Sequence, residues 1–322
     1  MAKTKLQQNL DKSKIHNKHF LTLADYSKEE LTYLVQYAIR LKELQKTGIP
    51  HRYLEGKTLA MIFEKSSMRT RVSFEAAMYH LGGHALFISR DEISMGKRET
   101  IPDTAKVLSR FVDGIMIRTF GHHIVEELAE NASVPIINGL TDDFHPCQVL
   151  ADLITIYEKT GKFEGNKLVY VGDGNNMAHS LLFGCAIMGI DCTIVAPKGF
   201  EVHKDMLEKV EKRAKESGAT IIQTNDVAAG VKDADIIYTD VWASMGFEDS
   251  AEERKAAFKD YQVNDQLVQH AKEDYMFFHC LPAHRGEEVS ASIMDGSHAV
   301  VFDQAENRLH AHKAILATLL AN

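Results

Sequence analysis

The sequence predicts an α/β protein of two domains, each with a parallel sheet flanked by helices. Short apolar runs rich in β-branched residues alternate with longer helical patterns along nearly the whole chain, which is typical of βαβ units. The length of 322 residues exceeds the ~250–300 at which a single core stops growing, so two cores are expected. With 45% hydrophobic and 25% charged residues, each half can bury a core of its own.

The first expected helix has a clear start signal. Ser27, with Glu30 three residues later, forms a capping box ahead of a run with helical apolar spacing. Four strands are expected after it, over residues 58–63, 84–88, 114–118 and 135–138. A helical pattern over 146–159 and a polar turn over 160–165 then lead to the second set of strands.

Six strands are expected in the second set, over residues 167–172, 192–196, 219–223, 235–240, 275–279 and 299–302. The chain ends with a long amphipathic helical pattern over residues 304–320. Periodicity alone does not decide which domain this last helix joins.

Composition excludes several classes of protein. The 37 Lys and Arg against 45 Asp and Glu give a charge of -8, which disfavours binding to nucleic acid or to an anionic membrane. The longest apolar run, residues 181–190, is about half the ~20 residues of a membrane span, and residues 1–14 lack the apolar stretch of a signal peptide. The four cysteines form no CxxC pair and the 16 histidines no HExxH pattern. We therefore expect a cytoplasmic protein with no metal and no cofactor.

A phosphate-binding turn is expected at residues 64–71, between a strand and a helix. The helix start offers unpaired backbone N–H groups, and Ser67, Thr70, Arg69 and Arg71 add donors and charge. The two arginines point to different faces if both are helical, so at most one reaches a ligand from inside the helix. A capped helix with solvated arginines explains the pattern equally well.

Two further segments follow strands in the first half. Arg118 closes the apolar strand 114–118, at the end where ligands bind in open parallel sheets. His145 and Gln148 stand at the start of the helix after the next strand and offer groups that contact a carbonyl or phosphoryl oxygen. Cys147 lies between them, but no second histidine and carboxylate identify it as a nucleophile. A structural helix cap is the alternative interpretation.

The turn after the strand 167–172 begins like a dinucleotide-binding motif. It reads Gly-Asp-Gly-Asn-Asn-Met over 172–177, and Met177 stands where the third glycine belongs, so the signal for NAD is weak. Its two asparagines could hold a carboxylate or an ammonium group through their amides.

Two segments of the second half carry more chemistry. Asp240 ends an apolar strand, precedes a Trp-Ala-Ser-Met-Gly turn, and could bind a substrate ammonium. His-Cys-Leu-Pro over 279–282 follows another strand, and Leu281 before proline is biased toward an extended conformation that can turn its carbonyl to a ligand. For Cys280 alone, an inert buried thiol is the commonest state.

Four motifs in order carry a resemblance to a known family. They are residues 67–71, 145–148, 240–246 and 279–282. In this order and spacing, over essentially its whole length, the chain resembles the ornithine carbamoyltransferases. The resemblance implies a first domain of residues 1–150 with the returning helix 304–322, which binds carbamoyl phosphate, and a second of residues 151–303, which binds ornithine. It places the active site in the cleft between the domains.

The resemblance also implies which residues act. Those implied to hold carbamoyl phosphate are Ser67, Met68, Arg69, Thr70, Arg71, Arg118, His145, Gln148, Cys280, Leu281 and Arg308. Those implied to hold ornithine are Asn176, Asp240, Ser244 and Met245. The catalytic group is expected to be Arg118, His145, Asp240 and Cys280. Two residues depart from the family pattern: Met68 replaces a threonine, and Ser94 replaces a glutamine that relatives lend to the neighbouring subunit.

The implied reaction is attack of the ornithine side-chain amine on carbamoyl phosphate, which gives citrulline and phosphate. A carbamoyltransferase for putrescine or another amine is the alternative, although it would not use an α-carboxylate site. An NAD-binding dehydrogenase is a distant alternative that leaves residues 67–71 and 279–282 unexplained. The resemblance suggests a homotrimer or a multiple of trimers, and a role in arginine biosynthesis or in the arginine deiminase pathway.

Overall fold

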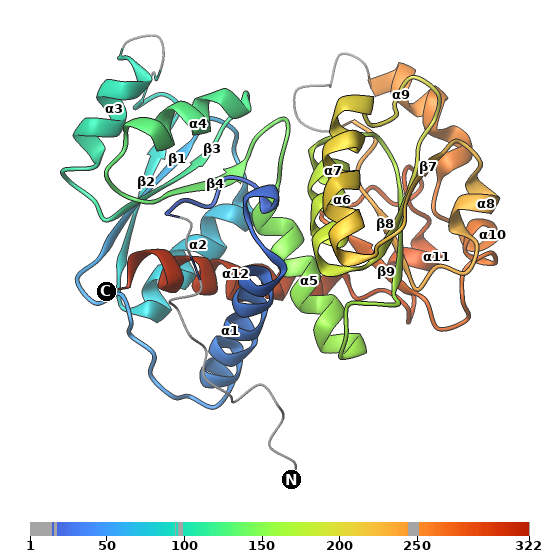
Figure 1. Ribbon diagram of the computed structural model, residues 1–322, viewed down its shortest axis with the longest axis horizontal. Helices are drawn as coiled ribbons and strands as arrows, with labels where there is room; N and C mark the ends of the chain where they lie inside the picture. The colour runs from blue at the N-terminus through green and yellow to red at the C-terminus, as the bar shows by residue number, and fades with distance from the viewer. Residues whose placement is uncertain (1–14, 16–17, 94, 96–98, 244–250, 322) are drawn as a thin grey trace. The chain divides into compact units, whose positions relative to one another are not determined.

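The computed structural model describes residues 15, 18–93, 95, 99–243 and 251–321. The chain divides into two compact units, which are treated separately below (Figure 1). Unit 1 comprises Met1–Ile154 and Asn307–Asn322, and unit 2 comprises Thr155–Glu306. Each unit contains a parallel sheet flanked by helices, so the predicted fold class is confirmed.

The sheet of unit 1 has the strand order β2-β1-β3-β4, and all its pairs are parallel. Its strands are β1 (Thr58–Phe63), β2 (His84–Ser89), β3 (Gly114–Arg118) and β4 (Ile136–Leu140), close to the predicted ranges. The strand order reverses between β1 and β3, and in such sheets ligands bind beyond the carboxyl ends at that point. Phe63 is paired with Arg118, so the turns that follow β1 and β3 begin side by side.

The helices of unit 1 cover both sides of this sheet. Figure 1 shows α3 (Ile101–Leu108) and α4 (His122–Asn131) on one side and α2 (Met68–Leu81) and α12 (Val301–Leu320) on the other. The remaining helices are α1 (Lys28–Lys46), the short 3-10 helix η3 (Leu23–Asp25) and α5 (Pro146–Thr160), which continues into unit 2. The predicted capping box of α1 is confirmed, because Ser27 accepts from the N–H of Glu30 at 3.2 Å and Glu30 accepts from the N–H of Ser27 at 2.8 Å.

The sheet of unit 2 has the strand order β7-β6-β5-β8-β9, again with all pairs parallel. Its strands are β5 (Lys167–Val171), β6 (Asp191–Val195), β7 (Ile221–Thr224), β8 (Ile236–Thr239) and β9 (Met276–His279). The order reverses between β5 and β8, so the segments after these two strands are where this sheet offers a ligand site.

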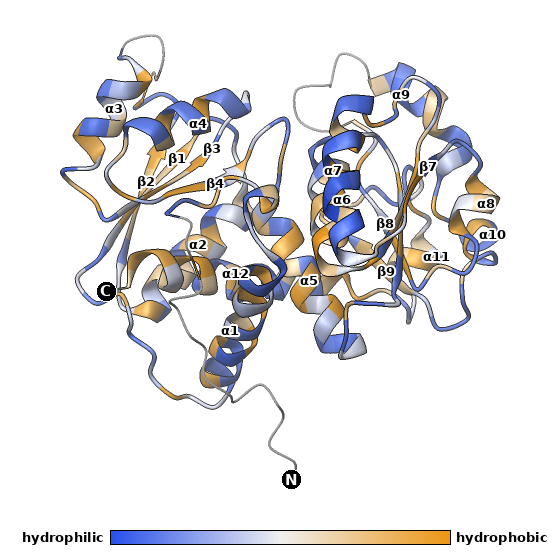
Figure 2. Cartoon of the chain, viewed as in Figure 1, coloured by the Kyte–Doolittle hydropathy of each residue, from blue (hydrophilic) through white to orange (hydrophobic). Residues whose placement is uncertain are grey.

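The helices of unit 2 differ in how much of their surface is exposed to solvent. They are α6 (Asn176–Met188), α7 (Lys204–Ser217), α8 (Val227–Val231), α9 (Ala251–Phe258), η5 (Lys259–Tyr261), α10 (Asp265–Val268) and α11 (Ala291–Met294). Residues 177–188 of α6 are all buried, whereas α7 buries only Val210 and Ala214. Figure 2 shows this contrast, with hydrophobic colour over the strands and α6 and hydrophilic colour along α7.

One predicted strand is wrong. Residues 299–302 are not a strand, because α12 begins at Val301 and only Ala299 makes an isolated bridge, to Phe277. The valine pair at 300 and 301 resembles a strand in sequence, but the backbone N–H of Val300 makes one bond to Phe277 before the helix starts. A short apolar run cannot be assigned by periodicity when it joins a bridge to a helix.

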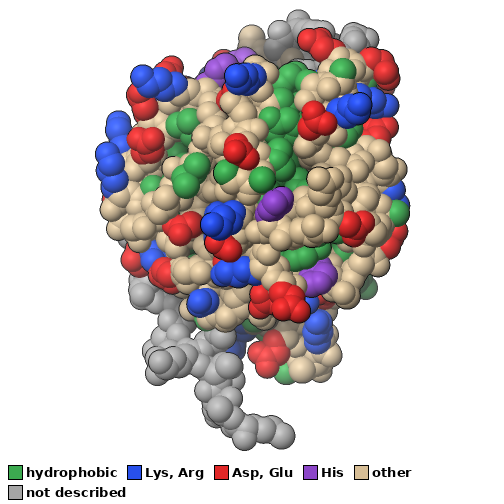
Figure 3. Space-filling view, turned by 90° about the vertical axis from the view of Figure 1, so that its right-hand side faces the viewer, with side chains coloured by type: hydrophobic (Ala, Val, Ile, Leu, Met, Phe, Trp, Pro, Cys, Tyr) green, Lys and Arg blue, Asp and Glu red, His purple; other side chains and the backbone are tan. Residues whose placement is uncertain are grey.

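The described helices and the surface bear on the expectations from composition. None of the helices in the described residues is both long and apolar enough to cross a membrane. On the face in Figure 3, basic side chains are interspersed with acidic ones.

Candidate active site

The turn between β1 and α2 forms the first part of the candidate site in unit 1. Ser67 is the N-cap of α2, and its hydroxyl accepts from the backbone N–H of Thr70 at 3.3 Å. The same hydroxyl donates to Thr70 Oγ1 at 3.1 Å, and Thr70 is fully buried. The helix start therefore presents ordered backbone and hydroxyl groups at its positive end, an arrangement that binds anions.

Arg308 of α12 meets this turn from a distant part of the sequence. Its guanidinium donates to Thr70 Oγ1 at 2.7 Å, and the residue is only 4% exposed. A hydroxyl that accepts hydrogen bonds from Ser67 and Arg308 keeps its own proton for donation to a third group. The next turn of α12 packs on the next turn of α2, where His312 stacks on Phe74 with ring centroids 3.7 Å apart.

His145 and Arg118 complete a group of positive and polar side chains. Burial holds the pKa of His145 well below its usual value of 6.5, and the nearby charges of Arg308, Arg118 and Arg69 lower it further. The imidazole is therefore neutral at pH 7 and can donate one N–H without adding a charge. We call Arg69, Arg118, Arg308, His145 and Thr70 the cationic cluster.

Gln148 is fixed in orientation by a residue that the sequence analysis did not identify. Its Nε2 donates to Asp152 Oδ1 at 2.9 Å, one turn further along α5. Because a carboxylate only accepts, the amide nitrogen must face Asp152 and the amide oxygen must face away. That Oε1 is buried and has no hydrogen-bond partner among the described residues, so it is an acceptor available to a ligand N–H. The spacing of four residues within a helix was the only sequence signal for this pair.

The two arginines of the 67–71 segment have different surroundings, as their helical spacing predicts. Arg71 is exposed, its Nε donates to Glu75 at 2.9 Å and its guanidinium lies 3.8 Å from the Phe87 ring centroid. Arg69 is half-buried and close enough to act on the pKa of His145. The described contacts bring Arg69 to the cationic cluster but do not bring Arg71 there. Met68 is 69% exposed on the same helix.

Cys147 does not have the surroundings of a nucleophile. Its thiol is buried and donates to the carbonyl of Asn138 at 3.3 Å. Burial raises the pKa of the thiol to about 12, so the reactive thiolate is not formed at neutral pH.

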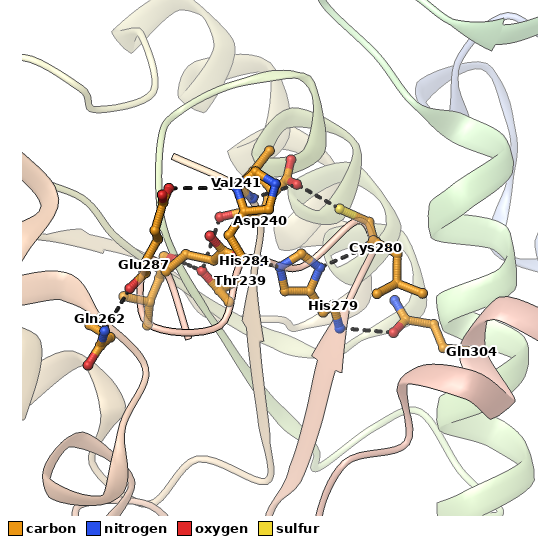
Figure 4. A network of polar contacts seen from close by, with 12 residues as sticks. Thr239, Asp240, Val241, Gln262, His279, Cys280, His284, Glu287 and Gln304 are labelled. Atoms are coloured by element: carbon orange, nitrogen blue, oxygen red, sulfur yellow. Dashed lines mark hydrogen bonds and ion pairs between the residues drawn. The ribbon is translucent and has the colours of Figure 1, made fainter. Parts of the chain in front are cut away.

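The candidate site of unit 2 is built at the ends of β8 and β9. Thr239 is paired with His279, which brings the next residues, Asp240 and Cys280, side by side (Figure 4). The Cys280 thiol donates to Asp240 Oδ1 at 2.9 Å, and the backbone N–H of Val241 donates to the same oxygen at 2.8 Å. Both side chains are buried, with 8% and 9% exposed. We call Asp240 and Cys280 the acid–thiol pair.

The glycine turn after β5 has a structural explanation. A Cβ on Gly174 would lie 2.4 Å from the backbone nitrogen of Val202, so only glycine fits there. Asn175 caps α6 by accepting from the N–H groups of Met177 and Ala178 at 3.0 and 3.3 Å. These contacts account for Gly174 and Asn175 without a dinucleotide. Asn176 is the first residue of α6 and stands at the end of the turn.

Further residues that the sequence analysis did not identify connect the segments after β5 and β8. Arg254 donates to Asp173 Oδ2 at 2.6 Å and to the carbonyl of Trp242 at 3.1 Å. Tyr170 of β5 is fully buried, and its pKa is raised well above 10 by burial and then by the charge of Asp240. No local pattern signals these contacts, because the residues belong to different elements.

One group of possible metal ligands occurs among the described residues. Single ligand atoms of His284, Glu287 and Glu288 lie within 4.8 Å of one another. Glu287 also forms an ion pair with Lys255 at 3.0 Å, which gives its carboxylate a cationic partner from the chain itself.

Three residues of the predicted site lie outside the described residues. They are Ser94, Ser244 and Met245. Their expected contacts, with the neighbouring subunit for Ser94 and with ornithine for the other two, stay predictions.

Comparison with known proteins identifies matches over nearly the whole chain. The family model described as "Aspartate/ornithine carbamoyltransferase, carbamoyl-P binding domain" matches residues 18–158. The model described as "Aspartate/ornithine carbamoyltransferase, Asp/Orn binding domain" matches residues 164–319.

Individual relatives agree with these models. The ornithine carbamoyltransferase of Anoxybacillus flavithermus is 58% identical over 306 residues, which cover 95% of this chain and 98% of the relative. The anabolic ornithine carbamoyltransferase of Pyrococcus furiosus is 56% identical over 300 residues, covering 93% and 95%. The solved structure of the ornithine carbamoyltransferase from Pyrococcus furiosus matches with a TM-score of 0.92 at 55% identity, covering 94% of this chain and 96% of that one.

Proposed function

The chain belongs to the aspartate/ornithine carbamoyltransferase family, and from this premise we infer that it transfers the carbamoyl group of carbamoyl phosphate to the side-chain amine of L-ornithine. The products are L-citrulline and phosphate. The observation that carries this conclusion is identity of 55–58% over nearly the full length of enzymes named for this reaction. An NAD-dependent dehydrogenase has no such support.

We propose that the cationic cluster binds carbamoyl phosphate. The N-terminus of α2, with Ser67, Arg69 and Arg308, offers the backbone N–H groups and guanidinium groups that a phosphate dianion requires. Cys280 and Leu281 are proposed to contact the carbamoyl group. The unpartnered Oε1 of Gln148 supports a contact with the carbamoyl NH₂, which needs an acceptor.

Charge on the carbamoyl oxygen is proposed to be stabilised by Arg118, His145 and Thr70. In the tetrahedral species this oxygen becomes negative, so donors aimed at it lower the barrier. A neutral His145 donates through one N–H, and Thr70 donates through the proton that its two incoming hydrogen bonds leave available.

The acid–thiol pair is proposed to receive the attacking amine of ornithine. An alkyl ammonium with a reference pKa of ~10.4 is mostly protonated at pH 7, so forming the neutral amine costs about 4–5 kcal/mol. Asp240 can orient the ammonium group and help it lose its proton, with phosphate as a second acceptor. Asn176, Asp240, Ser244 and Met245 are proposed to hold the α-carboxylate and α-amino groups of ornithine.

The reaction then needs no covalent enzyme intermediate. The amine nitrogen forms a bond to the carbamoyl carbon and the bond from that carbon to the phosphate oxygen breaks. Phosphate departs with the electron pair of that bond and takes up the proton that the nitrogen loses. The guanidinium groups of the cationic cluster neutralise the departing phosphate.

We also propose a homotrimer or a multiple of trimers. Support comes from apolar side chains on the outer surface of α2 and β2, where Met68, Val72, Tyr79 and Leu86 are 69%, 53%, 76% and 41% exposed. Apolar groups that cluster on a surface favour association. Light scattering coupled to size exclusion measures the mass, and a monomeric mass would contradict this proposal. Cytoplasmic location and a role in arginine biosynthesis or in the arginine deiminase pathway also stay proposals.

A citrulline assay tests the proposed function directly. The purified protein is incubated with carbamoyl phosphate and either ornithine or putrescine, and the ureido product and phosphate are measured. We expect one phosphate per citrulline with ornithine. Equal turnover of putrescine would favour the alternative assignment, a carbamoyltransferase for putrescine or another amine. No product with either amine would contradict carbamoyl transfer.

A further inference from the structure

The backbone of Leu281 adopts a conformation that leucine rarely takes. Its φ is 62°, and among the described residues the only other non-glycine residue with a positive φ is Asp233. A side chain with a Cβ is disfavoured in this left-handed region, so neighbouring contacts must hold the residue there. Residues kept in such conformations concentrate at functional sites.

His279 supplies the contact that holds Leu281. The backbone N–H of Leu281 donates to Nδ1 of His279 at 2.9 Å, two residues back along the chain. The backbone N–H of His279 in turn donates to Gln304 Oε1 at 3.0 Å (Figure 4). The histidine ring thus fixes the direction of the chain as it leaves β9.

Glu288 contacts the other nitrogen of that ring. Because Nδ1 of His279 accepts a hydrogen bond, the proton of the neutral ring is on Nε2. Nε2 lies 3.2 Å from Glu288 Oε1, and both side chains are fully buried. Glu288 also accepts from the backbone N–H of His284, so one carboxylate holds the ring before Leu281 and the backbone after it.

We infer that His279, oriented by Glu288, is a positioning residue that holds Leu281 and Cys280 in the geometry needed for carbamoyl transfer. This inference rests on the proposed function, which places both residues in the site. We call the contacts of Glu288 with His279, and of His279 with Leu281, the clamp. Cys280 lies between His279 and Leu281, so the clamp also determines where the Cys280 thiol contacts Asp240. Buried polar pairs add little net stability compared with apolar side chains, but they do select one geometry.

The first test compares two histidine variants of the same unit. His279→Phe keeps a ring but removes the acceptor for the Leu281 N–H. His298→Phe is the matched control, because His298 also bonds to a backbone group, the Tyr275 carbonyl at 2.8 Å, and stacks on the Tyr275 ring. We expect kcat for citrulline to fall on the order of 10²-fold in His279→Phe, since a misplacement of about 1 Å has that effect. KM for carbamoyl phosphate and the kcat of His298→Phe should change less than about threefold.

The second test uses Glu288 and does not depend on His279→Phe folding. Glu288→Gln keeps an oxygen that can accept from His279, whereas Glu288→Ala removes it. We expect the glutamine variant to retain most of the kcat and the alanine variant to lose it. Alkylation of Cys280 by iodoacetamide is measured by peptide mass spectrometry. It should become faster in Glu288→Ala and stay unchanged in Glu288→Gln.

The outcomes separate this inference from the proposed function. If the wild-type protein makes no citrulline, the proposed function is overturned. The alkylation rates of Cys280 in the two Glu288 variants would still report whether Glu288 and His279 hold Cys280 in place. An active wild type with equal kcat and equal alkylation rates in the glutamine and alanine variants overturns the inference. Equal losses in His279→Phe and His298→Phe overturn it as well, because they indicate a general effect on folding.

Discussion

The cationic cluster of unit 1 and the acid–thiol pair of unit 2 both follow the ends of parallel strands, but different contacts hold them. In unit 1, side chains gather at the start of α2 and are fixed by helix packing, as in the bond from Arg308 to Thr70. In unit 2, Asp240 and Cys280 are neighbours because β8 and β9 pair, and a buried histidine fixes the backbone beside them. We propose that unit 1 holds an anion and that unit 2 accepts a proton and orients an amine.

The units also differ in their histidines. The histidines with a clearly lowered pKa all belong to unit 1, and burial is the first cause in each; they are His19, His51, His80, His122, His145, His310 and His312. The guanidinium charges of the cationic cluster lower the pKa further only for His145 and His312, so these two rings are the ones buried in neutral form beside the arginines. The cationic cluster therefore keeps its positive charge on arginine, which does not lose its proton at neutral pH.

The largest expected effect tests the role of unit 2 in choosing the amine. We predict that ornithine is preferred over putrescine by at least ~10³-fold in kcat/KM, because polar groups of the site are left unpaired by an analogue without an α-carboxylate and an α-amino group. Asp240→Asn should reduce this ratio by impairing ornithine more than putrescine. Competition between the two amines for limiting carbamoyl phosphate measures it. An unchanged ratio in Asp240→Asn would assign amine choice to other residues.

The next effect tests the cationic cluster. We predict that Arg118→Ala lowers kcat on the order of 10²-fold, because a charge-assisted donor to the transition state is lost. The melting temperature is measured alongside, because Arg118 is only 6% exposed and its truncation also removes buried contacts. A folded variant with near-normal kcat would remove Arg118 from the proposed mechanism.

A smaller effect distinguishes two neighbouring arginines within α2. We predict that Arg69→Ala raises KM for carbamoyl phosphate by roughly 10-fold or more, the effect of losing one charged hydrogen bond, whereas Arg71→Ala changes it less than about threefold. The reason is that Arg71 already pairs with Glu75 and stacks on Phe87. Initial rates at varied carbamoyl phosphate measure both constants. Similar increases of KM in the two variants would indicate that Arg71 also contacts the phosphate.

The smallest effect concerns stability against pH. His312 is fully buried, and neither ring nitrogen has a hydrogen-bond partner among the described residues. Burial, and then the charge of Arg308, holds its pKa well below 6.5, so below pH 6.5 the unfolded chain binds a proton that the folded ring does not. Stability is therefore lost as the pH falls. We predict that His312→Phe reduces this loss by about 1 kcal/mol between pH 6.5 and 5.5.

Urea unfolding of wild type and His312→Phe at the two pH values measures this difference. At pH 7.5 the variant should be at least as stable as the wild type, because phenylalanine leaves no buried nitrogen unpaired. Identical losses of stability on acidification would mean that His312 is protonated in the folded protein.

The sequence by itself determined the features that depend on neighbours a few residues apart. The capping box of Ser27 and Glu30, the turn capped by Ser67 and the strands that lead to Arg118 and Asp240 were all predicted from local patterns. These signals are local because a helix cap joins residues three positions apart and a buried strand shows in its own apolar run. The prediction was wrong at residues 299–302, where two valines suit a strand but the chain turns into α12.

Only the tertiary structure decided which of these groups meet. Arg308 contacts Thr70 across 238 positions of sequence, and Glu288, from the segment after β9, contacts the ring of His279 and orients it. The same structure separates Arg69 from Arg71, although both have the same residue type in one motif. Such contacts depend on strand register and on helix packing. These bring together residues that are far apart in the chain, and the local sequence around one residue does not indicate its partner.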